Sequence, residues 1–117
     1  MYDFRKFFIN GAWVSPAGRR ELDVINPATE QAVASILPGT AEDVDAAVKA
    51  ARAAFETFGQ TSREERVALL ERIINAYKAR MKDVAVAISD EMGAPMKLAL
   101  HAQAASGLRH FMSSLNV

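Results

Sequence analysis

The sequence has 117 residues, no cysteine, and equal numbers of basic and acidic side chains, 14 of each. This length is typical of a single domain. The absence of thiols excludes disulfide scaffolds, thiolate metal sites and cysteine nucleophiles within these residues. The balanced charge argues against nucleic-acid and anionic-membrane partners. No apolar run reaches membrane-spanning length, and no secretory signal is recognisable, so we expect a cytoplasmic protein.

Residues 1–38 are predicted to form short strands and turns. Asn10-Gly11 separates the apolar runs 7–9 and 12–14, and both residues of this pair tolerate positive φ, so the two runs are expected to form a β-hairpin. Two more strands are expected at 21–25 and 31–37, with a turn at Asn26-Pro27 between them.

At Thr40 the pattern becomes helical, and it remains so to residue 117. Thr40 and Asp43 have the spacing of a helix-capping pair, and Gly59 is a natural helix terminator. Between them, apolar residues recur at the spacing of one helix face: Val44, Val48, Ala51, Phe55 and Phe58.

A second helix is predicted from Ser62, which forms a capping box with Glu65, to Met92, where Gly93 and Pro95 follow. This rod is long for so small a domain, which leaves a break near Val84 as an alternative. A third helix is expected from about Met96 to the end. The last residues continue the helical pattern with no capping glycine or proline, so we expect an interrupted chain, a single partial domain over residues 1–117.

Few residues suggest chemistry. His101 and His110 are nine positions apart, which on a helix places them on nearly opposite faces, so ordinary surface or packing histidines are the preferred interpretation. The glycines form no G-x-G pair and no P-loop, so no phosphate cradle is expected. Three adjacent acidic pairs could serve general acid–base catalysis: Glu42-Asp43, Glu64-Glu65 and Asp90-Glu91.

The first two pairs lie in first helical turns, where capping and the helix dipole explain them, and no partner base or nucleophile accompanies any pair. An independent enzyme using them is therefore a minor alternative. We predict no catalytic, cofactor-binding or metal-binding residue in this chain.

Three stretches in succession resemble the N-terminal part of the NAD(P)-dependent aldehyde dehydrogenases. They are FINGAWV, INPATEQAVASILPGTAEDVDAAVKAARAAF, and SREERVALLERIINAYKARMKDVAVAISDEMGAPMKLA with its ending at Glu91, Gly93 and Pro95. The resemblance covers essentially all 117 residues.

The resemblance implies an α+β piece, a hairpin and short strands followed by three helices, which opens an α/β Rossmann-like cofactor domain. It implies a parent enzyme that oxidises an aldehyde to a carboxylate with NAD or NADP. That chemistry uses a cysteine nucleophile, a glutamate that activates water and an asparagine that holds the oxyanion. In the family these groups lie downstream of this segment, so the chain alone is expected to bind no cofactor and to be inactive.

An isolated segment of this kind would leave apolar helix faces without their usual cover. We expect Ile73, Tyr77, Met81 and Val84, with Leu108, Phe111 and Leu115, to need a replacement partner, either by self-association or from the rest of the enzyme. The alternative function is a standalone, non-enzymatic α+β binding or assembly module derived from the same family.

Overall fold

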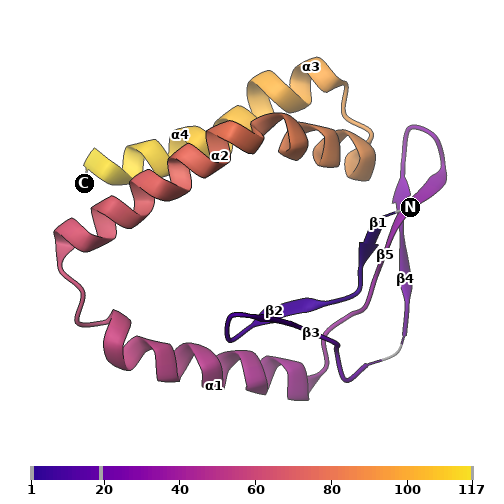
Figure 1. The fold of residues 1–117 in the computed structure, drawn as a ribbon. Coiled ribbons are helices and arrows are strands. Elements are labelled where there is room, and N and C mark those ends of the chain that lie inside the picture. Colours follow the sequence, from indigo (N-terminus) through magenta and orange to yellow (C-terminus); the bar gives the residue numbers. More distant parts are fainter. Residues whose placement is uncertain (1, 19, 117) are drawn as a thin grey trace. The chain divides into compact units, whose positions relative to one another are not determined.

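The computed structural model describes residues 2–18 and 20–116. Strands come first and helices follow, as the sequence predicts (Figure 1). The strands are β1 (Tyr2–Phe4), β2 (Phe7–Ile9), β3 (Ala12–Val14), β4 (Leu22–Asn26) and β5 (Gln31–Ile36). The helices are α1 (Ala41–Phe58), α2 (Arg63–Met92), α3 (Met96–Leu98), the π-helix η1 (Ala99–Ala104), α4 (Ala105–Ser113) and the 3₁₀ turn η2 (Ser114–Asn116).

Contacts group the chain into two compact units. The first comprises Met1–Ile25 and Gln31–Thr61, and the second Asn26–Glu30 and Ser62–Val117. None of the helices in the described ranges is long and apolar enough to cross a membrane.

The predicted hairpin of the first unit is confirmed. Phe7 pairs with Val14 and Ile9 with Ala12, which leaves the two-residue turn. Asn10 and Gly11 have φ of +52° and +77°, the left-handed pair that a tight hairpin turn needs. Phe8 and Trp13 stack edge to face across the hairpin, with ring centroids 5.3 Å apart.

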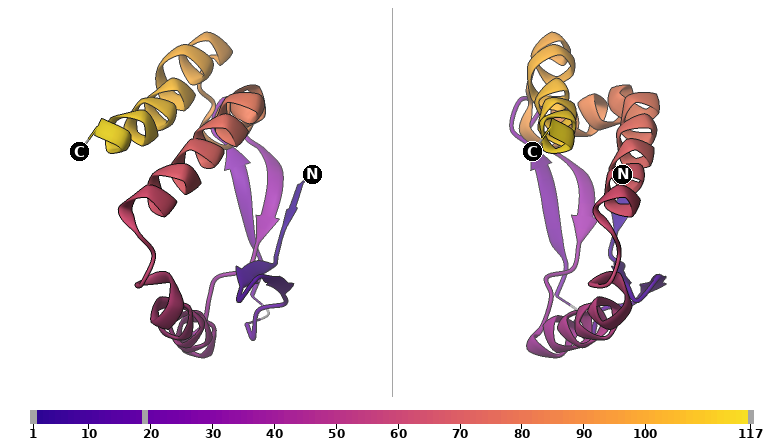
Figure 2. Two further views of the ribbon diagram at one scale, coloured as in Figure 1. Left: turned by 60° about the vertical axis from the view of Figure 1, so that its left-hand side comes forward. Right: turned by 90° about the vertical axis from the view of Figure 1, so that its left-hand side faces the viewer.

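The first unit also contains a three-stranded sheet in the order β1-β5-β4 (Figure 2). β4 and β5 agree with the two predicted strands to within one residue at each end. β1 was not predicted; it runs parallel to β5, with Tyr2 opposite Ala34 and Phe4 opposite Ile36. The central position of β5 explains why Ala34 is completely buried.

Helix α1 begins at a capping box in which Thr40 and Asp43 bond reciprocally. One Asp43 oxygen accepts the Thr40 N–H at 2.9 Å, and the other accepts the Ala17 N–H at 3.0 Å. These backbone hydrogen bonds, first from Thr40 and then from Ala17, hold the pKa of Asp43 below its usual value. Asp43 therefore ties the loop after β3 to the start of α1.

The second unit is built on α2, a continuous 30-residue helix, so the alternative of a break near Val84 is wrong. Its capping box, Ser62 with Glu65, is confirmed. Gly93 ends it with φ of +68°, and a Cβ there would lie 3.0 Å from the nitrogen and the Cβ of Ala28. Ala28 belongs to the turn that Asn26 organises, since the Asn26 side chain accepts the Ala28 N–H at 2.8 Å.

The third predicted helix returns along α2 as the succession α3, η1, α4 and η2 (Figure 1). Its core is made of small side chains, Ala85, Ala94, Ala99 and Ala104, with Met81, Val84, Ile88 and Leu100 packed against them. The apolar residues that were expected to lack a partner are half-buried, because α2 and α4 cover each other in part. The Tyr77 and Phe111 rings, for example, lie 5.9 Å apart.

The Asp43 carboxylate makes the stability of the first unit depend on pH, and the lowered pKa of Asp43 sets the sign of this dependence. Its stabilising effect is fully present above the unfolded-state pKa, ordinarily 3.8, and is lost as the pH falls through the lower folded-state pKa. We expect Asp43→Asn to lower the melting temperature at pH 7, and the difference from the parent chain to shrink as the pH falls through the lowered folded-state pKa of Asp43. Thermal unfolding followed by circular dichroism, at a series of pH values from neutral to acid, measures this difference in melting temperature.

Asp45→Asn is the matched control, since Asp45 is an exposed carboxylate on the same helix. An equal loss for both variants at pH 7, or a loss for Asp43→Asn that persists in acid, would contradict this role for Asp43.

Candidate functional site

Two of the three acidic pairs contain a residue that caps the start of a helix. Asp43 caps α1, and Glu65 caps α2 by accepting the Ser62 N–H at 2.7 Å while its own N–H donates to the Ser62 hydroxyl at 3.1 Å. Asp90 and Glu91 lie in the last turn of α2, the first half-buried and the second exposed. The described hydrogen bonds of Asp43 and Glu65 are structural.

The two histidines fall in different helical segments, His101 in η1 and His110 in α4, and both are exposed. Among the described residues, no three histidine or carboxylate side chains lie close enough together to hold a metal ion. That no residue here is catalytic or binds a cofactor stays a prediction.

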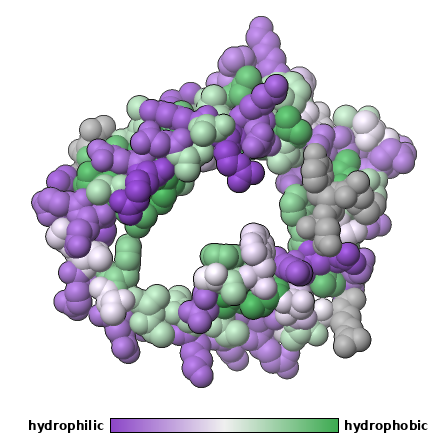
Figure 3. Space-filling model, viewed as in Figure 1, coloured by the Kyte–Doolittle hydropathy of each residue, from purple (hydrophilic) through white to green (hydrophobic). Residues whose placement is uncertain are grey.

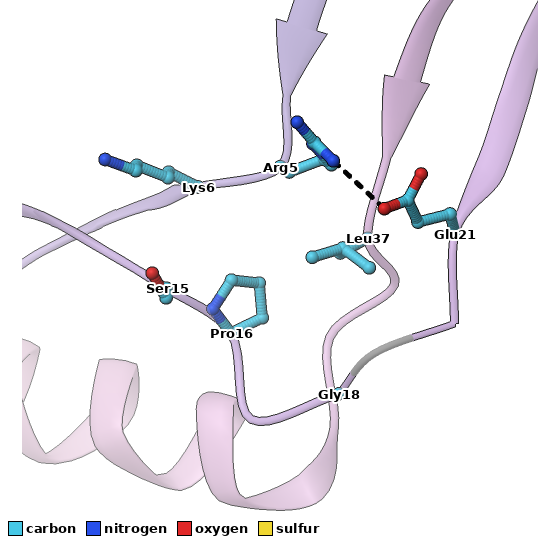
Figure 4. A pocket seen from close by; sticks show the side chains of 7 residues that line it. All are labelled: Arg5, Lys6, Ser15, Pro16, Gly18, Glu21 and Leu37. Atoms are coloured by element: carbon cyan, nitrogen blue, oxygen red, sulfur yellow. Dashed lines mark hydrogen bonds and ion pairs between the residues drawn. The ribbon is translucent and has the colours of Figure 1, made fainter.

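The first unit has an open pocket of about 500 Å³ beside the loop after β3 (Figure 4). Its lining residues are Arg5, Lys6, Ser15, Pro16, Gly18, Glu21 and Leu37. The Arg5 guanidinium points across it to Glu21 at 3.0 Å, whereas the Lys6 side chain extends away from this pair. Both partners of the ion pair are about half exposed, and pairs of this kind contribute little stability.

The second unit has an apolar groove of about 540 Å³ on α2 and α4. It is lined by Ile73, Ala76, Tyr77, Arg80, Asp83, Val84, Ala87 and Phe111. The only charged residues in this lining, Arg80 and Asp83, are paired with each other at 3.2 Å. The groove offers an apolar contact surface and no reactive group.

Large apolar side chains are exposed in both units, and Figure 3 shows hydrophobic residues at the surface over both. Helix α1 has the most regular set, since Val44, Val48, Phe55 and Phe58 are exposed by 57%, 52%, 69% and 49%. These residues form the apolar face that the sequence predicts for this helix. In a soluble protein, a surface of this kind ordinarily packs against another part of the protein.

Gln103, in the π-helix, is a polar residue that sequence reasoning missed. Its amide nitrogen donates to the Met92 sulfur at 3.5 Å, and its amide oxygen is buried with no hydrogen-bond donor among the described residues. An unpaired buried acceptor is costly, so Gln103 points to a donor that the described part of the chain does not supply.

Comparisons of the sequence and of the structure with known proteins lead to the same family. The pattern of the aldehyde dehydrogenase family matches residues 13–116. The chain belongs to the aldehyde dehydrogenase family. It corresponds to the N-terminal segment of these NAD(P)-dependent oxidoreductases, as the resemblance of its motifs predicts.

The aldehyde dehydrogenase segment is similar to several known proteins. It is 48% identical over its whole length to 3-succinoylsemialdehyde-pyridine dehydrogenase of a Pseudomonas species. Its structure matches that of an aldehyde dehydrogenase of Bartonella henselae over 99% of this chain, with a TM-score of 0.97 and 44% sequence identity. It also matches aldehyde dehydrogenase C of Pseudomonas syringae, solved with NAD⁺ and octanal, with a TM-score of 0.93 and 40% identity over 96% of the chain.

The chain spans about a quarter of the length of these relatives, 25% of the first and 24% and 23% of the two solved structures. The α+β arrangement predicted for the segment, with strands before helices, is confirmed by this likeness. The reactions named for the relatives are properties of chains about four times as long.

Because the Gln103 oxygen has no donor in the described ranges, replacing Gln103 is expected to have different effects in the segment and in a full-length enzyme. Replacing it by methionine keeps an unbranched chain but removes the buried acceptor, so Gln103→Met is expected to stabilise the 117-residue chain by about 1 kcal/mol. In a full-length enzyme that supplies the donor, the same change is expected to destabilise by a similar amount. Urea unfolding of both proteins measures the two effects.

Gln60→Met is the control, because Gln60 is exposed after α1. Destabilisation of the 117-residue chain by Gln103→Met, with Gln60→Met neutral, would show that the segment already satisfies the Gln103 oxygen.

Proposed function

We propose that this chain is the N-terminal segment of an enzyme that oxidises an aldehyde to a carboxylate with NAD or NADP. In this reaction water adds the second oxygen, hydride passes to the nicotinamide, and two protons are released. The supporting observation is the family match over residues 13–116, with 44% identity and a TM-score of 0.97 to a solved aldehyde dehydrogenase. The relatives are named or solved with different aldehydes, so the proposal specifies the class of substrate.

Within that enzyme we assign the segment a structural role. The sequence has no cysteine, so the nucleophile of the family's reaction would come from elsewhere in the enzyme. The hydrogen bonds of Asp43 to Thr40 and of Glu65 to Ser62 cap helices. The segment would bind no cofactor by itself, and its apolar faces would pack on the rest of the enzyme. A cytoplasmic location, where nicotinamide dinucleotides are available, completes this proposal.

The activity test compares two proteins. The purified 117-residue chain is expected to give no aldehyde-dependent NADH or NADPH signal at 340 nm and no cofactor binding by calorimetry. A full-length protein containing this segment is expected to show both, over a panel of aliphatic, aromatic and semialdehyde substrates. Turnover by the 117-residue chain would overturn the structural role. A full-length protein without aldehyde oxidation would overturn the enzymatic proposal.

We further propose that the isolated chain self-associates through exposed apolar surface. The α1 face supports this, because Phe55 is 69% exposed and Val48 is 52% exposed on the same side of the helix. Burying an apolar side chain of this size contributes about 1.5–3 kcal/mol, and the described residues contain no large side chain that is fully buried. Self-association would supply the cover that the remaining enzyme otherwise provides.

Sedimentation velocity over a range of concentrations tests this. The chain is expected to form a dimer or larger species, and Val48→Ser combined with Phe55→Ser is expected to weaken association by about 100-fold or more. The control is Lys49→Ser, an exposed polar residue on the same helix. A sharply melting monomer at every concentration would overturn self-association and favour a complete, standalone fold.

A further inference from the structure

The π-helix in the second unit is an uncommon backbone feature. Ala99–Ala104 winds with the wider π turn, between α3 and α4. A π segment accommodates one extra residue, so the helix that follows is rotated by about 100° relative to an uninterrupted α-helix. The side of α4 that lies against α2 is therefore decided in this segment.

Tyr77, on α2, contacts the end of the π-helix directly. Its hydroxyl donates to the backbone oxygen of Ala104 at 2.9 Å, across a sequence separation of 27 residues. Ala104 is the last π-helical residue and is completely buried. The donor reaches the backbone at the point where the helix changes from π to α winding.

Gly107 leaves the space that the Tyr77 ring occupies. A Cβ built on Gly107 would lie 2.6 Å from the Tyr77 hydroxyl oxygen and 3.2 Å from the ring carbon that carries it. Contacts under 3.0 Å require something to move, and here the moving atom is the end of a rigid ring that is hydrogen-bonded. The glycine lies inside α4, where it lowers helix propensity, so the close approach of Tyr77 provides a reason for its presence.

The same ring packs against Phe111, with centroids 5.9 Å apart, one turn beyond Gly107. Tyr77 and Phe111 both line the apolar groove of the second unit. If residues 99–104 rewound to α geometry, the rotation of α4 would move both Gly107 and Phe111 away from the ring. The hydrogen bond, the glycine contact and the ring contact thus all favour one register of α4.

We propose that Tyr77, Ala104 and Gly107 form a tyrosine lock, in which Tyr77 acts as a positioning residue that holds the π-helical register of residues 99–104. The lock selects the side of α4 that faces α2, and through Phe111 it shapes the apolar groove. Without the Tyr77 hydroxyl, residues 99–104 can also wind as an ordinary α-helix.

Hydrogen exchange measured by mass spectrometry on peptides covering residues 99–113 tests the lock. Tyr77→Phe keeps the ring and removes only the hydroxyl, and it is expected to speed exchange in this segment by about fivefold. Ser114→Ala is the matched control, because it also removes a hydroxyl that donates to a backbone oxygen, that of His110 at 3.0 Å, but within a single helical turn. The control is expected to leave the exchange of residues 99–104 unchanged. Equal exchange in the parent and Tyr77→Phe would overturn the proposal.

A double-mutant cycle gives a second, independent readout. Gly107→Ala is expected to destabilise the protein, and less so in the Tyr77→Phe background, where the atom 2.6 Å from the new methyl group is gone. Additive effects of the two substitutions on unfolding would overturn the lock. If Gly107→Ala alone does not fold, recovery of folding in the double variant supports the lock and failure to recover counts against it.

Discussion

The whole segment is constrained by how little large apolar surface it can bury. Among the described residues, the fully buried ones are alanines, Ala34, Ala85, Ala99 and Ala104. Small side chains let α2 and the returning helices approach closely, but they remove little apolar area from water. Apart from Ile74, which is 5% exposed, the large apolar side chains of the described residues remain half-buried or exposed, on α1 above all. We propose that the stability of this chain depends on what covers those surfaces.

Where burial is limited, local hydrogen bonds and backbone geometry define the elements. The two capping boxes fix the starts of α1 and α2, and the left-handed Gly93 fixes the end of α2 against the Ala28 turn. Asp43 adds a link between α1 and the loop after β3. Such contacts determine where each helix begins and ends without a large core, because they need only a few neighbouring residues.

The family assignment gives these observations a common explanation. A segment that spans about a quarter of its relatives, with exposed apolar faces and a Gln103 oxygen that has no donor among the described residues, has the properties expected of one part of a larger enzyme. Helix α2 contributes most of the residues that line the groove and supplies Tyr77 to the tyrosine lock, and Gly93 at its end contacts the Ala28 turn. We regard it as the scaffold through which the segment would support the remaining enzyme.

The sequence by itself determined the features that depend on near neighbours. The Asn10-Gly11 hairpin, both capping boxes, the end of α2 at Gly93 and the family motifs were all predictable, because a few adjacent residues specify each of them. Only the tertiary structure decided the pairing of β1 with β5, the π-helix, and the half-burial of the α2 and α4 faces. These depend on contacts between distant residues, such as Tyr77 with Ala104, whose geometry no local periodicity encodes.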